Sequence, residues 1–474
     1  MTHPRASWLG GIAAPWRACL AALSLAAFVP GSVLALAGTA QAPVPEADGG
    51  PTARVYHSTT TYFIQQQVLD PNDPSSRLYR FPIYEYLTVG ADDVGVPGLS
   101  LQVRGFGAIQ PTNRLGEDSF FGDLLVGTLS YRDPKGAWQL RAGRQMVTTI
   151  ASGYVLMDGV WVKVRPGADL DLQAYAGWMP DAQFEYGIDR LAFGGRIAYD
   201  PWIYGRIGLS FAGEHDQGIL SRAALALDYA LRLQPLVRGL EFQGWAAYDP
   251  FNGGFQETGN TLSYRASPAL RVSVDYGFFD PAARLPRTSI FRVFTDARHH
   301  KVGADVAWRS NWFTGARVLL DVDGRYYNYG GDGHGYLLRC KPSVETKGAV
   351  ASVTGVEIAR LANASNAYTE ARIFTSVRPH RLVQLTLDLD NYFYDDAING
   401  WEMWRRMDPK GLQAYRYTGD GGYSRSHVVG LTAGVDVFRG GRLQVDAAVT
   451  VNPDFTQRWS GLLKFQYAFS TNVK

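Results

Sequence analysis

Cysteine is nearly absent from this sequence, which has two cysteines in 474 residues. Cys19 lies in an N-terminal stretch that we expect to be removed, so Cys340 would be the single thiol of the mature chain. One thiol cannot form an intramolecular disulfide bond or supply the ligand set of a structural zinc site. We expect Cys340, which follows a glycine-rich segment, to lie in a loop or at a strand end.

Long apolar runs are missing beyond the N-terminus. No uncharged apolar run after residue 38 approaches the ~18 residues that a membrane helix requires. The one long uncharged stretch, 18–38, follows Arg5 and Arg17 and contains the small-x-small pattern Ala35-Leu36-Ala37. This arrangement is typical of a secretory signal peptide with its cleavage site.

Retention of this stretch as a membrane anchor is the alternative, and Pro30-Gly31 favours cleavage instead. We therefore predict a signal peptide over 1–37. The Gly-, Ala- and Pro-rich residues 38–53 would form a short periplasmic lead-in, and a single domain would occupy 54–474.

Net charge is also lacking. Removal of residues 1–37 leaves a mature chain with 44 basic and 44 acidic residues. A neutral chain offers no electrostatic attraction for a polyanion, so we expect no nucleic-acid partner.

Catalytic motifs are absent as well: the sequence has no G-x-S-x-G elbow, no H-E-x-x-H and no P-loop. The glycine-rich run 330–335 neither follows a βαβ strand nor opens a helix, which favours a surface loop. Neighbouring residues of a strand point to opposite faces, so His299-His300 is unsuited to share a metal. The run 213–216 is interpreted as an acidic loop, with calcium binding as the weaker alternative. We predict no enzymatic activity, no cofactor and no metal.

What the sequence does contain is a strict alternation of apolar and polar residues. In 459–469, Trp459, Leu463, Phe465, Tyr467 and Phe469 occupy odd positions, and Ser460, Lys464 and Gln466 occupy even ones. Successive side chains of a strand point to opposite faces, so one face is apolar and aromatic. A strand of about ten such residues suits the hydrocarbon core of an outer membrane.

The alternation recurs along the chain, most clearly in 160–165, 169–178, 269–278, 316–327, 381–394 and 440–452. Mean hydropathy is −0.14 although aromatic residues make up 13% of the chain, which fits a wall that turns only alternate residues to lipid. Short turns join some segments, and longer connections at 249–258, 279–298, 328–345 and 395–422 join others. We predict an all-β fold, a transmembrane antiparallel β-barrel of about 18 strands (roughly 16 to 20) that crosses the outer membrane many times.

A barrel of this size leaves a water-filled channel. The polar positions of the alternation would line it and form the substrate path: Arg141, Arg144, Gln145, Lys163, Arg165, Asp171, Tyr175, Arg271, Asp275, Arg317, Asp321, Asp323, Arg325, Tyr327, Asp388, Asp390 and Tyr392. For most of these residues, pairing of opposite charges across neighbouring strands to brace the wall is the simpler role. The functional alternative is a Tyr-lined path of mixed charge, suited to sugar hydroxyls.

The run Arg141-Ala142-Gly143-Arg144-Gln145, followed by Met157-Asp158-Gly159-Val160, resembles a signature of alginate-export-type outer-membrane porins. The resemblance implies a porin-like barrel in which Arg144 and Gln145 lie near the channel wall. Strict alternation from Leu140 would turn Arg144 outward, so this placement requires a bulge. The mixed lumen charge departs from the strongly cationic pore of alginate exporters, which speaks against an acidic polymer.

Three functions remain open at this point. The first is a secretion channel that passes a polysaccharide from the periplasm to the cell surface, and the resemblance favours it. The second is a passive or substrate-selective porin for uptake of small solutes, such as sugars or anions. The third is a structural or adhesive barrel. The expected partners are outer-membrane lipid, the barrel-assembly machinery, the solute and, for export, periplasmic export components.

Overall fold

The computed structural model describes residues 53–69, 77–109, 120–180, 190–201, 204–234, 237–251, 253–285, 298–313, 315–330, 333–348, 350–362, 367–394, 425–452 and 455–473. The predicted signal peptide and all of the lead-in except Ala53 lie outside these residues, as does the connection 395–424. Within the described residues, no helix is long and apolar enough to cross a membrane.

The described residues form 23 strands and one short helix, α2 (Pro281–Arg284). The strands are β1 (Ala53–Leu69), β2 (Arg77–Arg80), β3 (Ile83–Asp92), β4 (Leu99–Ile109), β5 (Phe120–Arg132), β6 (Trp138–Thr149), β7 (Gly153–Val164), β8 (Leu170–Trp178), β9 (Arg190–Tyr199), β10 (Gly205–Asp216), β11 (Ile219–Arg232), β12 (Leu240–Asp249), β13 (Gly254–Arg265), β14 (Leu270–Phe279), β15 (His299–Phe313), β16 (Ala316–Asn328), β17 (His334–Thr346), β18 (Ala351–Ala362), β19 (Ala367–His380), β20 (Val383–Tyr394), β21 (Arg425–Phe438), β22 (Gly441–Asn452) and β23 (Phe455–Val473).

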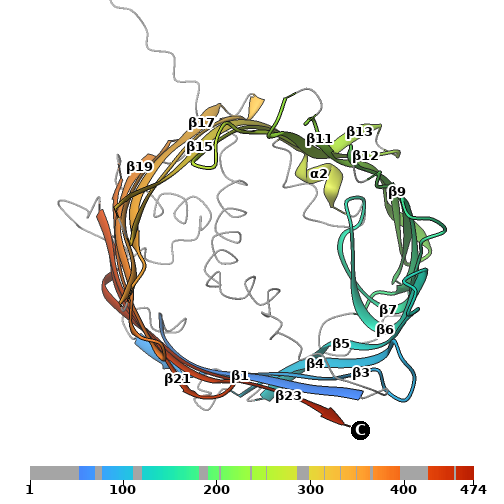
Figure 1. Cartoon of the computed structure of the whole chain (residues 1–474), viewed down its shortest axis with the longest axis horizontal. Coiled ribbons are helices and arrows are strands. Elements are labelled where there is room, and N and C mark those ends of the chain that lie inside the picture. Colours follow the sequence, from blue (N-terminus) through green and yellow to red (C-terminus); the bar gives the residue numbers. More distant parts are fainter. Residues whose placement is uncertain are drawn as a thin grey trace, which may run out of the picture.

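Each strand pairs with its neighbours in the sequence, always antiparallel, and β1 pairs with β23 to close a barrel (Figure 1). β2 and β3 pair with successive parts of β1, and the bond from Ile64 N–H to Pro82 O at 3.1 Å bridges the break between them. Together they therefore occupy a single position in the wall. Pro82 has no N–H, so the ladder is interrupted there. The 23 strands therefore occupy 22 wall positions. Strands about 4.8 Å apart at a tilt of 35–45° give a barrel roughly 45 Å across.

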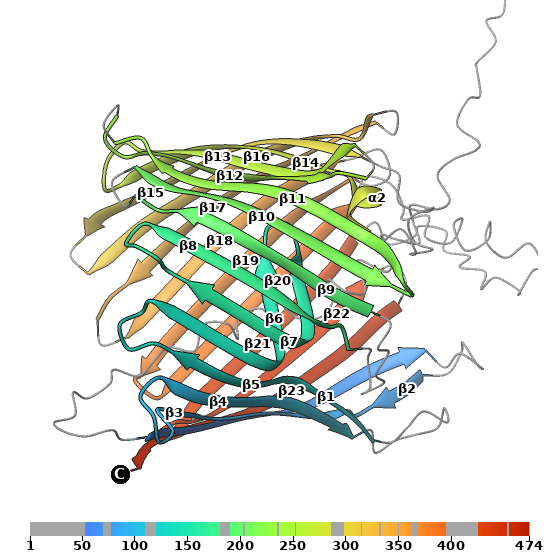
Figure 2. The ribbon, with the colours of Figure 1, turned by 90° about the vertical axis from the view of Figure 1, so that its right-hand side faces the viewer.

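The two rims differ in their connections. β1 begins and β23 ends at the same rim, where the turns 133–137, 266–269, 381–382 and 439–440 are short. In Figure 2 this is the left rim, next to the C-terminus. At the opposite rim β14 and β20 end and β15 and β21 begin, so the strands joined by the longer connections meet that rim. Short turns on the periplasmic side and long loops outside are the arrangement of outer-membrane barrels.

The outer face is apolar. The exposed large side chains include leucine, valine and isoleucine along the middle of the strands and aromatic residues towards both rims, among them Tyr199, Tyr204, Tyr264 and Phe438 at one and Trp178, Phe255, Tyr326 and Trp459 at the other. Ring closure between β1 and β23 and an apolar outer face are the features that a bilayer-spanning sheet needs. The chain is thus an all-β, multi-pass outer-membrane barrel, as predicted.

The predicted number of about 18 strands is wrong. The wall strands β13 and β17 were missed: β13 begins within the predicted connection 249–258, and β17 lies almost wholly within the predicted connection 328–345. β13 turns Asn260 and Thr258 outward, and such polar residues hide the apolar period. Cys340 lies in the middle of β17 beside Val322 and Ile358 on the outer face, rather than in a loop.

Candidate functional site

One hairpin leaves the wall and enters the lumen. β6 and β7 pair with each other over their whole length, from Trp138↔Val164 to Thr149↔Gly153. However, β6 pairs with β5 only as far as Arg144↔Gly127, and β7 pairs with β8 only as far as Asp158↔Trp178. Residues 145–157, the inward hairpin, therefore fold into the barrel, where Figure 1 shows them in teal inside the ring.

Three glycines in register make this bend: Gly143 pairs with Gly159, which pairs with Gly177. Gly143 has a φ of 106°, and a Cβ added there would lie 2.1 Å from Gly127 O. A Cβ on Gly159 would lie 2.2 Å from Ala176 O. Only residues without a side chain permit so close an approach of neighbouring backbones.

Arg144 and Gln145 hold the bend in place. The Arg144 side chain, 4% exposed, donates from Nε and Nη2 to the two carboxylate oxygens of Asp158, each at 2.8 Å. Its Nη1 also donates to Leu124 O at 3.1 Å, on the strand that the hairpin leaves. Gln145 Nε2 donates to Gly159 O at 3.1 Å, a carbonyl at the bend. The side chains thus satisfy backbone groups at the position where the wall ladder stops.

The inward hairpin packs against the inner wall through an apolar face. Val147, Val155 and Met157 form a buried cluster with Trp161, Tyr175 and Ala192. The Ala151 tip reaches farther around the barrel and contacts a group of small residues on β10 to β12, namely Ala212, Ala224, Ala226 and Ala247. Small side chains on the inner wall leave room for the tip.

Polar contacts fix the tip. Arg222 donates from Nη1 to Ser152 O and from Nη2 to Ala151 O, both at 3.2 Å, and forms an ion pair with Glu214 at 2.6 Å. Ala151 N–H donates to Ser210 Oγ at 3.3 Å. These bonds join the tip to β10 and β11 without strand pairing. The inward hairpin is therefore held along the inner wall as a ledge that projects into the lumen.

The other face of the ledge is open to the lumen. Tyr154 is 75% exposed, and Thr148, its cross-strand neighbour, is exposed as well. α2 lies inside the ring near the tip, and its Arg284 pairs with Glu257 on β13 and approaches Gly153 (Figure 1). The ledge and the helix narrow the lumen from one side.

The predicted path residues near the ledge form ion pairs or ring contacts with side chains of the wall. Lys163 and Arg165 both pair with Asp171, at 2.5 and 3.6 Å. The Arg141 guanidinium lies 3.9 Å from the ring centroid of Trp161, a cation–π contact. Tyr175 is buried beneath the hairpin.

On β14 to β20 the inner wall carries a charge ladder. Its predicted members form ion pairs across strands: Asp275 with Lys301 at 3.1 Å, Arg317 with Glu345 at 3.4 Å, Asp323 with Arg339 at 2.5 Å, and Asp388 and Asp390 with Arg372. Within β16, Asp323 also lies 3.9 Å from Arg325. Tyr327 stacks on Tyr329, and Tyr392 meets Tyr368 edge-on. Arg271 and Asp321 are exposed on the same inner face.

Tyr329 lies in the loop after β16, and burial together with Tyr327 raises its pKa. The phenol therefore stays neutral at physiological pH.

Sequence reasoning did not find Glu357 or the wall residues that receive the tip of the inward hairpin. Glu357 accepts ion pairs from Arg339, Lys341 and Arg372, each at 3.7 Å, and joins β17 to β19. It escaped notice because β17 was not recognised as a strand. The wall residues under the hairpin tip were indicated by the run 223–226 of β11. Both faces of the strand are apolar there, although one of them faces the lumen, where polar residues are expected.

The run 213–216 is not an acidic loop: it ends β10, and its Glu214 pairs with Arg222. In the part of the chain that the structure describes, no group of His, Cys, Asp or Glu could hold a metal ion. His299 and His300 lie in β15 on opposite faces, and His300 Nδ1 is 3.0 Å from the Tyr276 hydroxyl.

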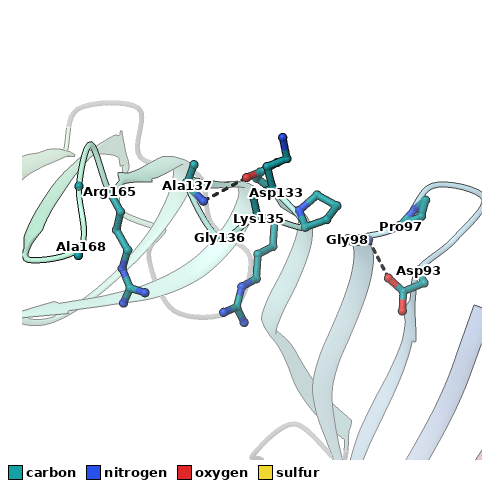
Figure 3. A pocket seen from close by; sticks show the side chains of 12 residues that line it. Asp93, Pro97, Gly98, Asp133, Lys135, Gly136, Ala137, Arg165 and Ala168 are labelled. Atoms are coloured by element: carbon teal, nitrogen blue, oxygen red, sulfur yellow. Dashed lines mark hydrogen bonds between the residues drawn. The ribbon is translucent and has the colours of Figure 1, made fainter. Parts of the chain in front are cut away.

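A pocket lies at the rim with the short turns. An open recess of about 750 Å³ is lined by the turns 93–98 and 133–137 and by residues 165–168 (Figure 3). Its two carboxylates stabilise the turns in which they lie: Asp93 accepts a hydrogen bond from Gly98 N–H, and Asp133 accepts one from Ala137 N–H. The recess is a feature of the short turns and lies apart from the ledge.

No family model and no curated protein matches the sequence. Solved structures that it resembles include OpdK from Pseudomonas aeruginosa with vanillate (9% identity, TM-score 0.41, 88% of this chain and 99% of that one) and OccAB2 from Acinetobacter baumannii (7%, 0.43, 88% and 98%). A BenF-like porin from Pseudomonas fluorescens Pf-5 is similar at 8% identity and a TM-score of 0.42, over 88% of this chain and 99% of that one.

The expectation of polysaccharide export is wrong. The solved structures that this chain resembles include the outer membrane protein OpdK, which was also solved with vanillate, and a BenF-like porin. The resemblance to alginate-export-type porins finds no support among them. In this chain the Gly-Arg-Gln and Asp-Gly runs that suggested it form the bend of the inward hairpin.

Proposed function

We propose that this protein is a non-enzymatic porin through which small solutes enter across the outer membrane. The observation that carries the proposal is the ledge: an ordered hairpin, held by glycine hinges and by Arg222, that narrows an otherwise wide barrel. A channel that admits small solutes needs such a narrowing, because a barrel of this width would also pass large molecules.

The chemistry of the lumen supports solutes of mixed or no charge. Along the charge ladder, acidic and basic side chains form ion pairs with each other, so the net field beside this part of the wall is small. Tyr154 on the ledge and the tyrosines of the charge ladder offer hydroxyls and ring faces to a passing solute. Weak, scattered contacts of this kind slow a solute without trapping it.

The test is conductance in planar bilayers together with swelling of liposomes in neutral sugars of increasing size. The native protein should give discrete conductance with little ion selectivity and a sharp upper size limit. Arg222→Ala removes the bonds to Ser152 O and Ala151 O, so the tip should loosen, the conductance should become larger and noisier, and larger sugars should pass.

Arg206→Ala is the matched control, because Arg206 is an exposed arginine on the inner face of β10. It should leave the size limit unchanged. A native barrel that passes neither ions nor sugars would refute the porin proposal, and an unchanged size limit in Arg222→Ala would show that the ledge does not set it.

A further inference from the structure

The wall is incomplete where the hairpin leaves it. β5 pairs with β4 along its length up to Phe120, but on its other side the pairing with β6 stops at Gly127. In the part of the chain that the structure describes, residues 120–126 of β5 therefore have no strand partner on that side. In Figure 2 the upper parts of β6 and β7 turn away from the direction of their neighbours.

This free edge, residues 120–126, lies at membrane depth. Its outward residues Phe120 and Leu124 belong to the apolar outer face, and they lie towards the rim with the long loops, so the edge faces the outer leaflet. Unpaired N–H and C=O groups are very unfavourable in hydrocarbon. Arg144 satisfies Leu124 O from inside the barrel, which shows that the lumen reaches this edge.

Five aromatic rings lie on the inner wall beside the free edge. This aromatic patch consists of Tyr62, Tyr84, Tyr86, Phe106 and Phe121 on β1, β3, β4 and β5. Tyr86 stacks on Phe106 with ring centroids 5.6 Å apart, and Phe121 meets both Phe106 and Tyr84 edge-on at about 6 Å. Phe121 belongs to the free edge itself and is 38% exposed.

Tyr62 is buried, Tyr84, Tyr86 and Phe106 are partly exposed and Phe121 is exposed. An aromatic patch that is partly open to a polar lumen needs an explanation, because apolar area left in water costs roughly 25 cal/mol per Å². The contrast with the charge ladder on β14 to β20 is sharp, since there the inner wall is built from ion pairs. Ring faces and ring edges bind other rings and apolar groups.

We propose that the gap between β5 and the inward hairpin is a lateral opening through which an apolar, ring-bearing molecule passes between the lumen and the outer leaflet, using the aromatic patch as its binding site. The route is separate from the axial path over the ledge. It goes beyond the proposed uptake of small polar solutes and does not depend on it.

The opening is tested with nitroxide labels in lipid bilayers, using the collision of each label with oxygen, which dissolves in lipid, and with a water-soluble nickel chelate. In a Cys340→Ser background, labels are placed at Phe121→Cys, beside the free edge, and at Ser130→Cys. Ser130 faces inward on the same strand but is flanked by β6 at Arg141. A label on the native Cys340, on the outer face, gives the lipid reference.

The label at position 121 should collide with oxygen severalfold more often than the label at 130 and approach the value at 340. If position 121 matches 130, the wall is closed to lipid and the proposal is overturned.

The binding site is tested with N-phenyl-1-naphthylamine, a fluorescent apolar ring compound. Phe106→Ser combined with Phe121→Ser should weaken its binding to the purified barrel severalfold. Leu337→Ser combined with Leu361→Ser is the control, because these residues form an apolar cross-strand pair on the inner wall of β17 and β18. Equal binding by both double variants would overturn the assignment of the patch.

Both variants are first checked for heat-modifiable migration, which reports a folded barrel. Ion conductance along the axis should be unchanged in both, so a failure of the lateral route is distinguishable from a failure of the porin proposal.

Discussion

Arg144 joins three strands at the point where the wall bends. Its guanidinium binds both carboxylate oxygens of Asp158 on β7, lies 3.4 Å from Asp123 on β5, and also donates to Leu124 O. The planar fork of arginine matches a carboxylate in two parallel bonds, which lysine cannot reproduce. A residue that sequence analysis placed on the solute path therefore has a clear role in holding the ledge.

Arg144→Ala should destabilise the barrel strongly. It removes a buried cation and leaves Asp158 and Asp123 without it, a change that typically costs about 3–5 kcal/mol. Arg141→Ala, which loses a cation–π contact with Trp161, should cost about 0.5–2 kcal/mol. Urea unfolding followed by heat-modifiable migration measures both midpoints. A loss for Arg144→Ala no larger than for Arg141→Ala would contradict the role of Arg144.

The inward hairpin depends on backbone geometry as much as on contacts. β6 and β7 keep their ladder with each other while both give up their outer partners, so the pair bends as one unit. Such a bend needs glycine in neighbouring strands, since side chains at these positions would overlap with backbone atoms. The lost wall pairing is offset by burial of Val147, Val155 and Met157, each worth roughly 1.5–3 kcal/mol.

Gly143→Ala tests this element. An L-residue at positive φ costs about 1–2 kcal/mol, and here the added methyl group would also overlap with Gly127 O. We expect a lower unfolding midpoint together with a larger channel conductance, because the inward hairpin can no longer pack against the inner wall.

Gly136→Ala is the matched control: Gly136 has a φ of 73°, and nothing lies within 4 Å of the added Cβ. It should lose stability without any change in conductance. Equal conductance of the two variants would contradict the prediction, because it would show that the glycine bend does not control how far the hairpin narrows the lumen.

The whole barrel depends on a single closure between the two ends of the chain. β1 and β23 pair from Ala53↔Val473 to Gln66↔Ser460, so the last strand must be held against both β22 and β1. Its outward residues Phe465, Tyr467 and Phe469 meet lipid, while Lys464 and Gln466 face the lumen. We predict that the barrel-assembly machinery recognises this closing strand.

Replacing Phe465, Tyr467 and Phe469 together with Ser should prevent assembly. Each large side chain contributes roughly 1.5–3 kcal/mol by leaving water, so the closing strand would lose its preference for the membrane. The variant should appear as unfolded protein in the periplasm, measured by fractionation and heat-modifiable migration.

The control is Gln466→Ser with Ala468→Ser, on the lumen face of the same strand. This variant should assemble normally. Normal assembly of the triple variant would refute the importance of the outer face.

The sequence by itself determined the barrel, its compartment and which side of most strands meets lipid. These follow from a period of two, which is a local property of the chain and survives in strands such as β20 and β22. It also showed that charges of both signs line the lumen. The number of wall positions was missed in part because β13 carries the polar residues Thr258 and Asn260 on its outer face, where they hide the period. In β17 the outward residues Leu338, Cys340 and Val344 are apolar, but the strand follows a glycine-rich run that predicts a loop.

Only the tertiary structure decided that residues 145–157 leave the wall as an inward hairpin and do not continue β6 and β7 within it. Their alternation is that of an ordinary hairpin, and the departure from the wall depends on residues far away in the sequence. The small residues Ala212, Ala224 and Ala247 leave space for the tip, and Arg222 binds its carbonyls. Such a fit is a property of surfaces brought together by ring closure, and no local pattern of residues encodes it.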